Sequence, residues 1–375
     1  MKHLLIWLRL NFSKIRIKYP ALLTLSLILA LCLAEIGFRF FHNIPFQFEN
    51  VLKRKLDLFL STYPAEYDQV LGWIPKRGNY GRSNVWNTQV LIEPNGFRSN
   101  GPKTSKLDGS RKVILAVGDS FTFGDQVSDD ETWPAYLEAM TGVKVINAGV
   151  FGYGVDQIIL RTESVFGPLK PTWVILSFIP DDIQRCELSA RTCVHKPYFT
   201  LTKGLTLHNV PVPLPNPAYR RLGPLRLILG YSSLADFLMM TYFRSYWLSG
   251  LSLEQRVHNQ GVEVTCALFS RFERFLKTKK VNGLVVIQMP KNLRKNELKK
   301  IKAVREYLNQ TSLHVLDLHE PLMRLKKSDS RKYKQFFTYH MTPEGNKWVA
   351  EQIVVFLGPS LQFGGERGRN ERKNH

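Results

Sequence analysis

The stretch VILAVGDSFTFG, residues 113–124, decides the fold class of this chain of 375 residues. Its first five residues are all apolar, which suits a strand buried on both faces of a parallel sheet. Glycines at 118 and 124 then let the backbone turn from the strand into a helix. A serine at such a turn projects from the edge of the sheet, and its own N–H can face a developing oxyanion. Ser120 is therefore a candidate nucleophile.

The same strand pattern recurs along the chain. Four more apolar runs suit buried strands, at 143–146, 173–178, 284–288 and 314–318. Amphipathic segments that suit helices lie at 132–140, 155–165, 253–277, 297–309 and 347–357. The alternation predicts a doubly wound, flavodoxin-like α/β/α domain of about five parallel strands over 111–358. Sites in such folds form where loops leave the carboxyl ends of the strands.

Two further loops fall at those strand ends. The segment NAGVFGYG, 147–154, follows the second strand; it lacks a dinucleotide-binding glycine pattern, and taken alone a plain tight turn explains it. Near the C-terminus stands YHMTPEG, 339–345, in which Thr342 can cap a helix that Pro343 begins, with His340 on the loop just before. A lone histidine is usually structural. The order of the three pieces after successive strands makes the combination specific.

Together these pieces resemble the GDSL/SGNH hydrolase family over about two-thirds of the chain. The shorter motifs LGW (71–73), NGFR (95–98) and KPYF (196–199) look like its membrane-anchored, extracytoplasmic bacterial members. The resemblance implies that Ser120 is the nucleophile, that Gly152 supplies a backbone oxyanion donor and that His340 is the general base. It implies no cofactor and no metal.

Two residues depart from the family pattern. In IPDD, 179–182, Asp181 stands where the family has an asparagine that donates to the oxyanion. An ionised carboxylate cannot donate, and losing one such donor typically costs about a hundred- to a thousand-fold in rate. Burial would favour a protonated, donating Asp181. Phe337 occupies the usual position of the triad acid, whose neutralisation costs roughly ten-thousand-fold in a well-studied triad. A backbone carbonyl, a carboxylate from elsewhere or a Ser–His dyad are the alternatives.

The N-terminal region has the pattern of a membrane anchor. Residues 1–18 form a basic leader, and 19–41 are apolar except for Glu35 and Arg39, an i, i+4 pair near the far end. Positive residues inside predict a cytoplasmic N-terminus and a periplasmic main domain, in a single-pass protein of a bacterial inner membrane. A cleaved signal peptide is the rival interpretation, weakened by the long leader and a poor cleavage site. A lipobox at Cys32 is weaker still, because Leu31 precedes it.

Three other regions complete the organisation of the chain. Residues 42–110 predict a small β-containing lead-in that ends in a linker. Residues 222–248 are apolar but interrupted by three charges, which favours a helical insertion over the domain and not a second span. It is a candidate lid or substrate-facing wall, with plain packing as the alternative. The Gly-rich, charged end, 359–375, predicts a disordered tail.

Charge and cysteines narrow the function classes. The net charge is +21, but Lys and Arg are spread along the chain and no nucleic-acid module is readable, so no nucleic-acid partner is expected. The charge suits anionic lipid or polymer surfaces, or solubility alone. Of four cysteines, Cys186 and Cys193 are near neighbours that can form a disulfide outside the cytoplasm, and no metal-site spacing is present.

The residues favour a serine hydrolase that cleaves an acyl ester on a glycan, lipid or envelope polymer through Ser120 and His340. The alternative is a catalytically impaired module that uses the cleft to bind an envelope polysaccharide or a protein partner. A third hypothesis is an O-acyltransferase that uses the same serine and passes the acyl group to an alcohol instead of water.

Overall fold

The structure is a computed structural model that describes residues 2–46, 48–53, 64–82, 88–102, 112–191, 194–214, 222–248 and 254–361. The chain divides into two compact units. One comprises Met1–Leu58 with Asn216–Ser252, and the other comprises Phe59–Pro215 with Leu253–His375.

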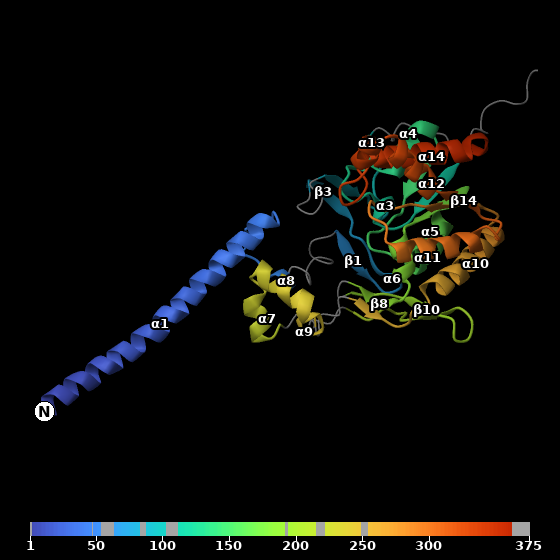
Figure 1. The fold of residues 1–375 in the computed structure, drawn as a ribbon. Coiled ribbons are helices and arrows are strands. Elements are labelled where there is room, and N and C mark those ends of the chain that lie inside the picture. Colours follow the sequence, from blue (N-terminus) through green and yellow to red (C-terminus); the bar gives the residue numbers. More distant parts are fainter. Residues whose placement is uncertain are drawn as a thin grey trace, which may run out of the picture. The chain divides into compact units, whose positions relative to one another are not determined.

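A five-stranded parallel sheet forms the centre of the larger unit (Figure 1). Its strands are β5 (Val113–Val117), β6 (Lys144–Asn147), β7 (Trp173–Phe178), β13 (Asn282–Ile287) and β14 (His314–Asp317). The spatial order is β14-β13-β7-β5-β6, so the chain reverses direction across the sheet after β6. The predicted doubly wound α/β fold is confirmed, and the switch point lies at β5 and β7.

Helices cover both faces of this sheet (Figure 1). On one face, α4 (Trp133–Thr141) packs against α14 (Pro343–Leu361). On the other, α10 (Gly261–Lys279) packs against α5 (Val155–Leu169), α6 (Pro180–Arg185) and α11 (Lys295–Leu308). The remaining short helices are α3 (Ser120–Phe123), α12 (His319–Ser328) and α13 (Ser330–Gln335). The buried residues of α10 recur every three or four positions, which is the amphipathic pattern that predicted this helix from the sequence.

One predicted helix begins too early. Residues 253–277 were expected to be helical throughout, but Glu254–Arg256 form strand β12, which pairs antiparallel with β8 (Leu188–Arg191). Pairing with the backbone of β8 outweighs local propensity here, and the helix starts only at Gly261. The same small sheet includes β9 (Val194–His195), and a hairpin of β10 (Tyr198–Thr200) with β11 (Thr206–His208) follows.

The lead-in contains two antiparallel hairpins, as its turns predicted. They are β1 (Ala65–Asp68) with β2 (Gly72–Pro75), and β3 (Gly78–Arg82) with β4 (Gln89–Ile92). The predicted linker falls mostly on 103–111, and the predicted disordered tail from 362 onward; both lie outside the described residues.

The smaller unit consists of α1 (Lys2–Phe41) with α7 (Pro224–Leu229), α8 (Ser233–Tyr242) and α9 (Arg244–Trp247). Within α1, Tyr19–Phe41 has a mean hydropathy of 2.3 and is long enough to cross a bilayer. The insertion at 222–248 is helical, as predicted. These helices form one unit with α1, because polar groups near the end of α1 bind the start of α8. Their expected place over the main domain stays a prediction.

Candidate active site

Ser120 lies where β5 ends, at the first residue of α3. Asp119 caps this helix, since its Oδ1 accepts a hydrogen bond of 2.9 Å from the Phe121 N–H. Gly118 permits the turn, because a Cβ at that position would lie 2.6 Å from the Ser177 carbonyl oxygen. Only a residue without a side chain fits between the two strands, and this close approach holds Ser120 at the sheet edge.

His340 reaches Ser120 from the far end of the chain. Its Nε2 lies 3.0 Å from Ser120 Oγ, a bond that the serine hydroxyl donates when the imidazole carries its proton on Nδ1. Gln126 holds the loop, since its Oε1 accepts a bond of 2.9 Å from the His340 N–H. Thr342 caps α14 with its side-chain oxygen, as predicted. The structure thus brings the two predicted residues together in the arrangement of a nucleophile and its base.

The surroundings of His340 make its imidazole a weak base. Burial, with the nearby charge of Arg185, lowers the pKa of His340 from 6.5 to about 4. Nδ1 is buried and has no hydrogen-bond partner among the described residues. The nearest carboxylate, Asp125, lies 3.8 Å from Nε2, the nitrogen that faces the serine. Phe337, at the family's triad-acid position, packs in the core against Tyr333. None of these groups takes the role of the missing acid.

Asp181 lies at the cleft but is not enclosed. Its side chain is 55% exposed, and its Oδ2 lies 3.8 Å from Arg185 Nη2. The helix α6 begins at Pro180, just after β7, and places this side chain at the open cleft. The burial that would favour a protonated, donating Asp181 is therefore absent. The positive charge beside this carboxylate comes from the guanidinium of Arg185.

Arg185 is the site residue that the sequence did not reveal. A single oxygen, Asp119 Oδ2, lies 3.4 Å from Ser120 Oγ and 3.3 Å from Arg185 Nη1. The same Nη1 also bonds Asp182 Oδ1 and donates to the Tyr153 carbonyl at 2.8 Å. In the sequence, an arginine three and four residues after two aspartates indicates only a surface ion pair. Here it is a buried cation beside the nucleophile.

The charge of Arg185 persists despite its burial. Burial alone lowers its pKa, but the carboxylates of Asp182, Asp119 and Asp181 outweigh this and raise the pKa above its ordinary value. Burial also raises the pKa of Asp119, and that of Asp182 still more because the Asp119 charge adds to it. A fixed positive charge in a dry site can stabilise negative charge that develops on a substrate oxygen.

The loop that carries Gly152 is braced by the lead-in. Gly152 is buried with φ of 79°, and its carbonyl accepts a bond of 2.6 Å from Arg191 Nη1. It does not line the cleft. Trp73 Nε1 donates to the Phe151 carbonyl at 3.0 Å, and Arg98 donates to the backbone carbonyls that end α3. The LGW and NGFR motifs therefore hold the loops that follow β6 and β5.

A cleft of about 540 Å³ opens over Ser120 and His340. This volume suits a small-molecule ester or one unit of a polymer. Exposed basic side chains line one wall: Lys291 and Arg294 after β13, and Lys326 of α12. Glu297 offsets one of them, at 3.9 Å from Arg294. The entrance consequently favours acidic over basic substrates.

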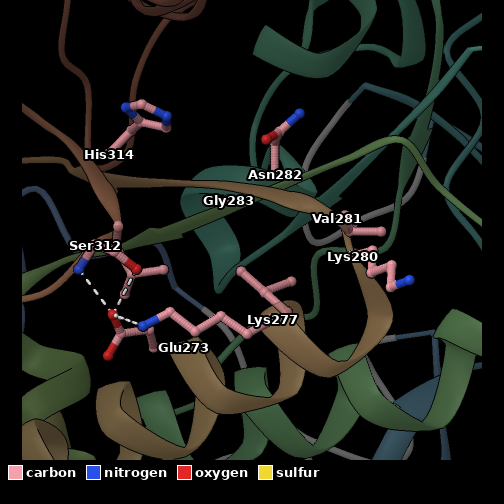
Figure 2. A pocket seen from close by; sticks show the side chains of 10 residues that line it. Glu273, Lys277, Lys280, Val281, Asn282, Gly283, Ser312 and His314 are labelled. Atoms are coloured by element: carbon pink, nitrogen blue, oxygen red, sulfur yellow. Dashed lines mark hydrogen bonds and ion pairs between the residues drawn. The ribbon is translucent and has the colours of Figure 1, made fainter.

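Another cavity, of about 280 Å³, lies at the opposite edge of the sheet, where β13 and β14 begin (Figure 2). Glu273 dominates it and accepts bonds from Lys277 Nζ and from the N–H and hydroxyl of Ser312. The acceptor Oε1 is thus saturated, and the amino ends of parallel strands are not where α/β sites form. The hydrogen bonds of Glu273 stabilise the connection that leads into β14.

The predicted disulfide stays a prediction, because Cys193 lies outside the described residues. Cys186 is buried, and its Sγ donates to the Asp182 carbonyl at 3.3 Å. Within the part of the chain that the structure describes, no group of three His, Cys, Asp or Glu side chains is arranged to hold a metal ion.

Fold and site together define a class: a doubly wound α/β protein with a Ser–His pair at the carboxyl edge of its sheet. Similar solved structures include a protein described as lipolytic and of the G-D-S-L family, from Desulfitobacterium hafniense (15% identity, TM-score 0.39, covering 66% of this chain and 100% of that one). An acetylxylan esterase from Geobacillus stearothermophilus shares 14% identity, with a TM-score of 0.38, over 70% of this chain and 99% of its own. A lipase/acylhydrolase from Enterococcus faecalis shares 15%, with a TM-score of 0.39, over 68% and 100%. No family model and no curated protein matches the chain.

Proposed function

We propose that this protein is a serine esterase that hydrolyses an acyl ester on a glycan, lipid or envelope polymer. The observation that carries the proposal is the 3.0 Å contact between Ser120 Oγ and His340 Nε2 at the floor of the cleft. Ser120 attacks the ester carbonyl while Nε2 takes its proton. The C–O bond to the alcohol then breaks and the imidazolium returns the proton to that oxygen. Water, deprotonated by the same nitrogen, then attacks the acyl-serine. The bond between the acyl carbon and Ser120 Oγ breaks, the imidazolium returns its proton to Oγ, and the acid leaves.

Arg185 compensates in part for the lost asparagine donor. Its guanidinium shares Asp119 Oδ2 with the nucleophile, and it lines the cleft. The backbone N–H of Ser120, at the start of α3, supplies a directed hydrogen bond, and the arginine supplies charge. The role of Gly152 as a backbone oxyanion donor stays a prediction, because Gly152 is not among the residues that line the cleft.

The test uses the full chain in detergent and a chromogenic short-chain ester, beside Ser120→Ala. We expect turnover that Ser120→Ala abolishes, and covalent labelling of Ser120 by a fluorophosphonate probe. A folded protein that neither turns over the ester nor reacts with the probe would contradict an esterase.

A second function, a binding module, is favoured by the absence of a partner for His340 Nδ1 among the described residues and by the basic cleft wall. That hypothesis requires anionic polysaccharide to bind equally well to Ser120→Ala and to the unchanged protein. An O-acyltransferase would form the same acyl-serine, and product analysis with a sugar acceptor separates it from the esterase.

We also propose that the protein spans a membrane once. The apolar segment Tyr19–Phe41, with the basic leader before it, supports a single-pass anchor with the larger unit on the extracytoplasmic side, in a bacterial inner membrane. Protease protection in intact spheroplasts is the direct test of that orientation.

A further inference from the structure

The helices α7, α8 and α9 leave many of their large apolar side chains exposed. Within 222–248, Trp247 is the only large hydrophobic side chain that is buried, and α7 and α8 bury no residue. The exposed side chains include Ile228 at 70% and Tyr242 at 72%. Others are Leu225, Phe237, Phe243 and Tyr246. A segment of this composition facing water would be a large aggregation-prone patch, so its native surroundings are apolar.

The start of α8 is bound by a carboxylate of the anchor helix. Glu35 Oε1 accepts from the Ser233 N–H at 2.7 Å, and Oε2 accepts from the Leu234 N–H at 2.9 Å and the Ser232 hydroxyl at 2.7 Å. These donors belong to the first turn of a helix, where backbone N–H groups lack partners within the helix. One side chain satisfies all three, and its negative charge suits the positive end of the helix dipole.

Arg39 completes this contact between α1 and the start of α8, which we call the joint. It pairs with Glu35 at 2.5 Å and donates to the carbonyls of Pro45 at 3.0 Å and Tyr231 at 3.2 Å. The rings of Phe38 and Phe237 meet beside it, with centroids 5.3 Å apart. The polar groups of the joint are therefore bonded to one another, which is the condition for placing them where water is scarce.

The remaining charges of the insertion also suit a membrane interface. Asp236 accepts a bond of 2.7 Å from Trp247 Nε1, and Arg226 lies over the Tyr246 ring. Arg244 is exposed among aromatic residues, where a lipid phosphate can reach it. Tyrosine and tryptophan are the residues that proteins place at the level of the lipid head groups.

We infer that α7, α8 and α9 lie in the interface of the bilayer that α1 spans, with their exposed apolar side chains inserted among the lipids. The inference rests on the proposed membrane span, and not on the esterase activity. The depth argument comes from the joint: Glu35, Phe38 and Arg39 all fall inside the apolar segment Tyr19–Phe41, so the start of α8 lies at the level where that segment ends. An amphipathic element attached at this level contacts lipid, so the insertion attaches the protein to the membrane at a second place.

Photocrosslinking in the full chain tests this. Benzoylphenylalanine replaces Ile228 or Tyr242 in protein reconstituted into nanodiscs of phosphatidylethanolamine and phosphatidylglycerol, with Leu25 as the position within the span. Lys302, a 69% exposed side chain of α11, is the control in the larger unit. We expect mass-shifted lipid adducts at Ile228 and Tyr242, at a yield within about threefold of Leu25, and none at Lys302.

Three outcomes would overturn the inference. Adducts at Leu25 without adducts at Ile228 and Tyr242 would show that the insertion lies away from lipid. Crosslinks between two copies of the chain at Tyr242 would make this face a protein interface. Absence of lipid adducts at Leu25 would remove the span and the inference with it. Ester hydrolysis, measured on the same samples, reports separately on the proposed function.

Discussion

The low pKa of His340 predicts how hydrolysis depends on pH. The base must be neutral to accept the proton of Ser120, so kcat/KM follows the neutral fraction of the imidazole in the free enzyme. Burial and Arg185 lower this pKa from 6.5 to about 4. Because the shift is downward, neutral His340 persists into acid, and activity is lost only as the pH falls through about 4.

At pH 5 the lowered pKa of His340 and the ordinary pKa of a histidine give very different fractions of neutral imidazole. With the pKa at about 4, about 90% of His340 is neutral there, whereas an ordinary histidine would be only about 3% neutral. The rate at pH 5 should therefore be close to the rate at pH 8. The assay is kcat/KM for a short-chain ester between about pH 3.5 and 9, followed by acid release in a pH-stat or by chromatography. The Ser120→Ala rate is subtracted at each pH.

A half-activity point near pH 6.5 would refute this reasoning, provided that circular dichroism shows folded protein down to pH 4. Arg185→Gln offers a second check, because removing the positive charge eases formation of the imidazolium. Its half-activity point should move to higher pH while its plateau rate falls. A fallen plateau with an unmoved half-activity point would show that Arg185 does not act on His340.

Three further predictions concern other parts of the molecule. Asp181→Asn replaces a half-exposed carboxylate with a donor and should raise kcat at pH 7 by up to about a hundredfold; a lower kcat at unchanged KM would contradict this. Gly118→Ala should reduce the free energy of unfolding by about 1–3 kcal/mol or more, since its Cβ has no room. Its control, Gly167→Ala in a helix with open space, should add about 0.4–1 kcal/mol, and equal losses in the two urea titrations would count against the packing argument. Glu35→Gln should speed hydrogen exchange of the first α8 amides, whereas Glu49→Gln, at an exposed position of the same unit, should leave it unchanged; equal exchange in both would mean that the cap is weak.

The sheet could be predicted from the sequence because its strands carry their own signal. The run at 113–117 is apolar throughout and bounded by a glycine turn, and β5 has these same limits. The strand at 254–256 has no such signal: Glu254, Gln255 and Arg256 are polar, and they become a strand only because β8 offers backbone partners from a distant part of the chain. Pairing of this kind is a tertiary effect that a local pattern cannot contain.

The candidate site also has residues that the sequence could predict and one that it could not. The places of Ser120 and His340 follow from turn chemistry and chain order, and the structure brings their side chains within 3.0 Å. Arg185 could not be predicted, because its role depends on Asp119, which comes from another strand end, and on the direction that α6 gives Asp181. The contact between the insertion and α1 could not be predicted for a similar reason. The partner of the insertion, Glu35, lies 197 residues before Ser232, so no local pattern in the insertion indicates the contact.

Asp181 and Phe337, which depart from the pattern of the family that the sequence resembles, are physically linked through one cation. A buried Arg185 favours an oxyanion but disfavours an imidazolium, and proton transfer from Ser120 to His340 creates both charges together. The pKa shift of His340 corresponds to about 3 kcal/mol against the imidazolium, which a carboxylate on Nδ1 would normally counter. In a site built this way the attack on the ester is the difficult step, because Ser120 must give its proton to a weak base. Aryl and enol esters, whose carbonyl carbon is more electrophilic, should therefore be hydrolysed much faster than simple alkyl esters, and equal rates for the two kinds of ester would show that His340 is an efficient base despite its surroundings.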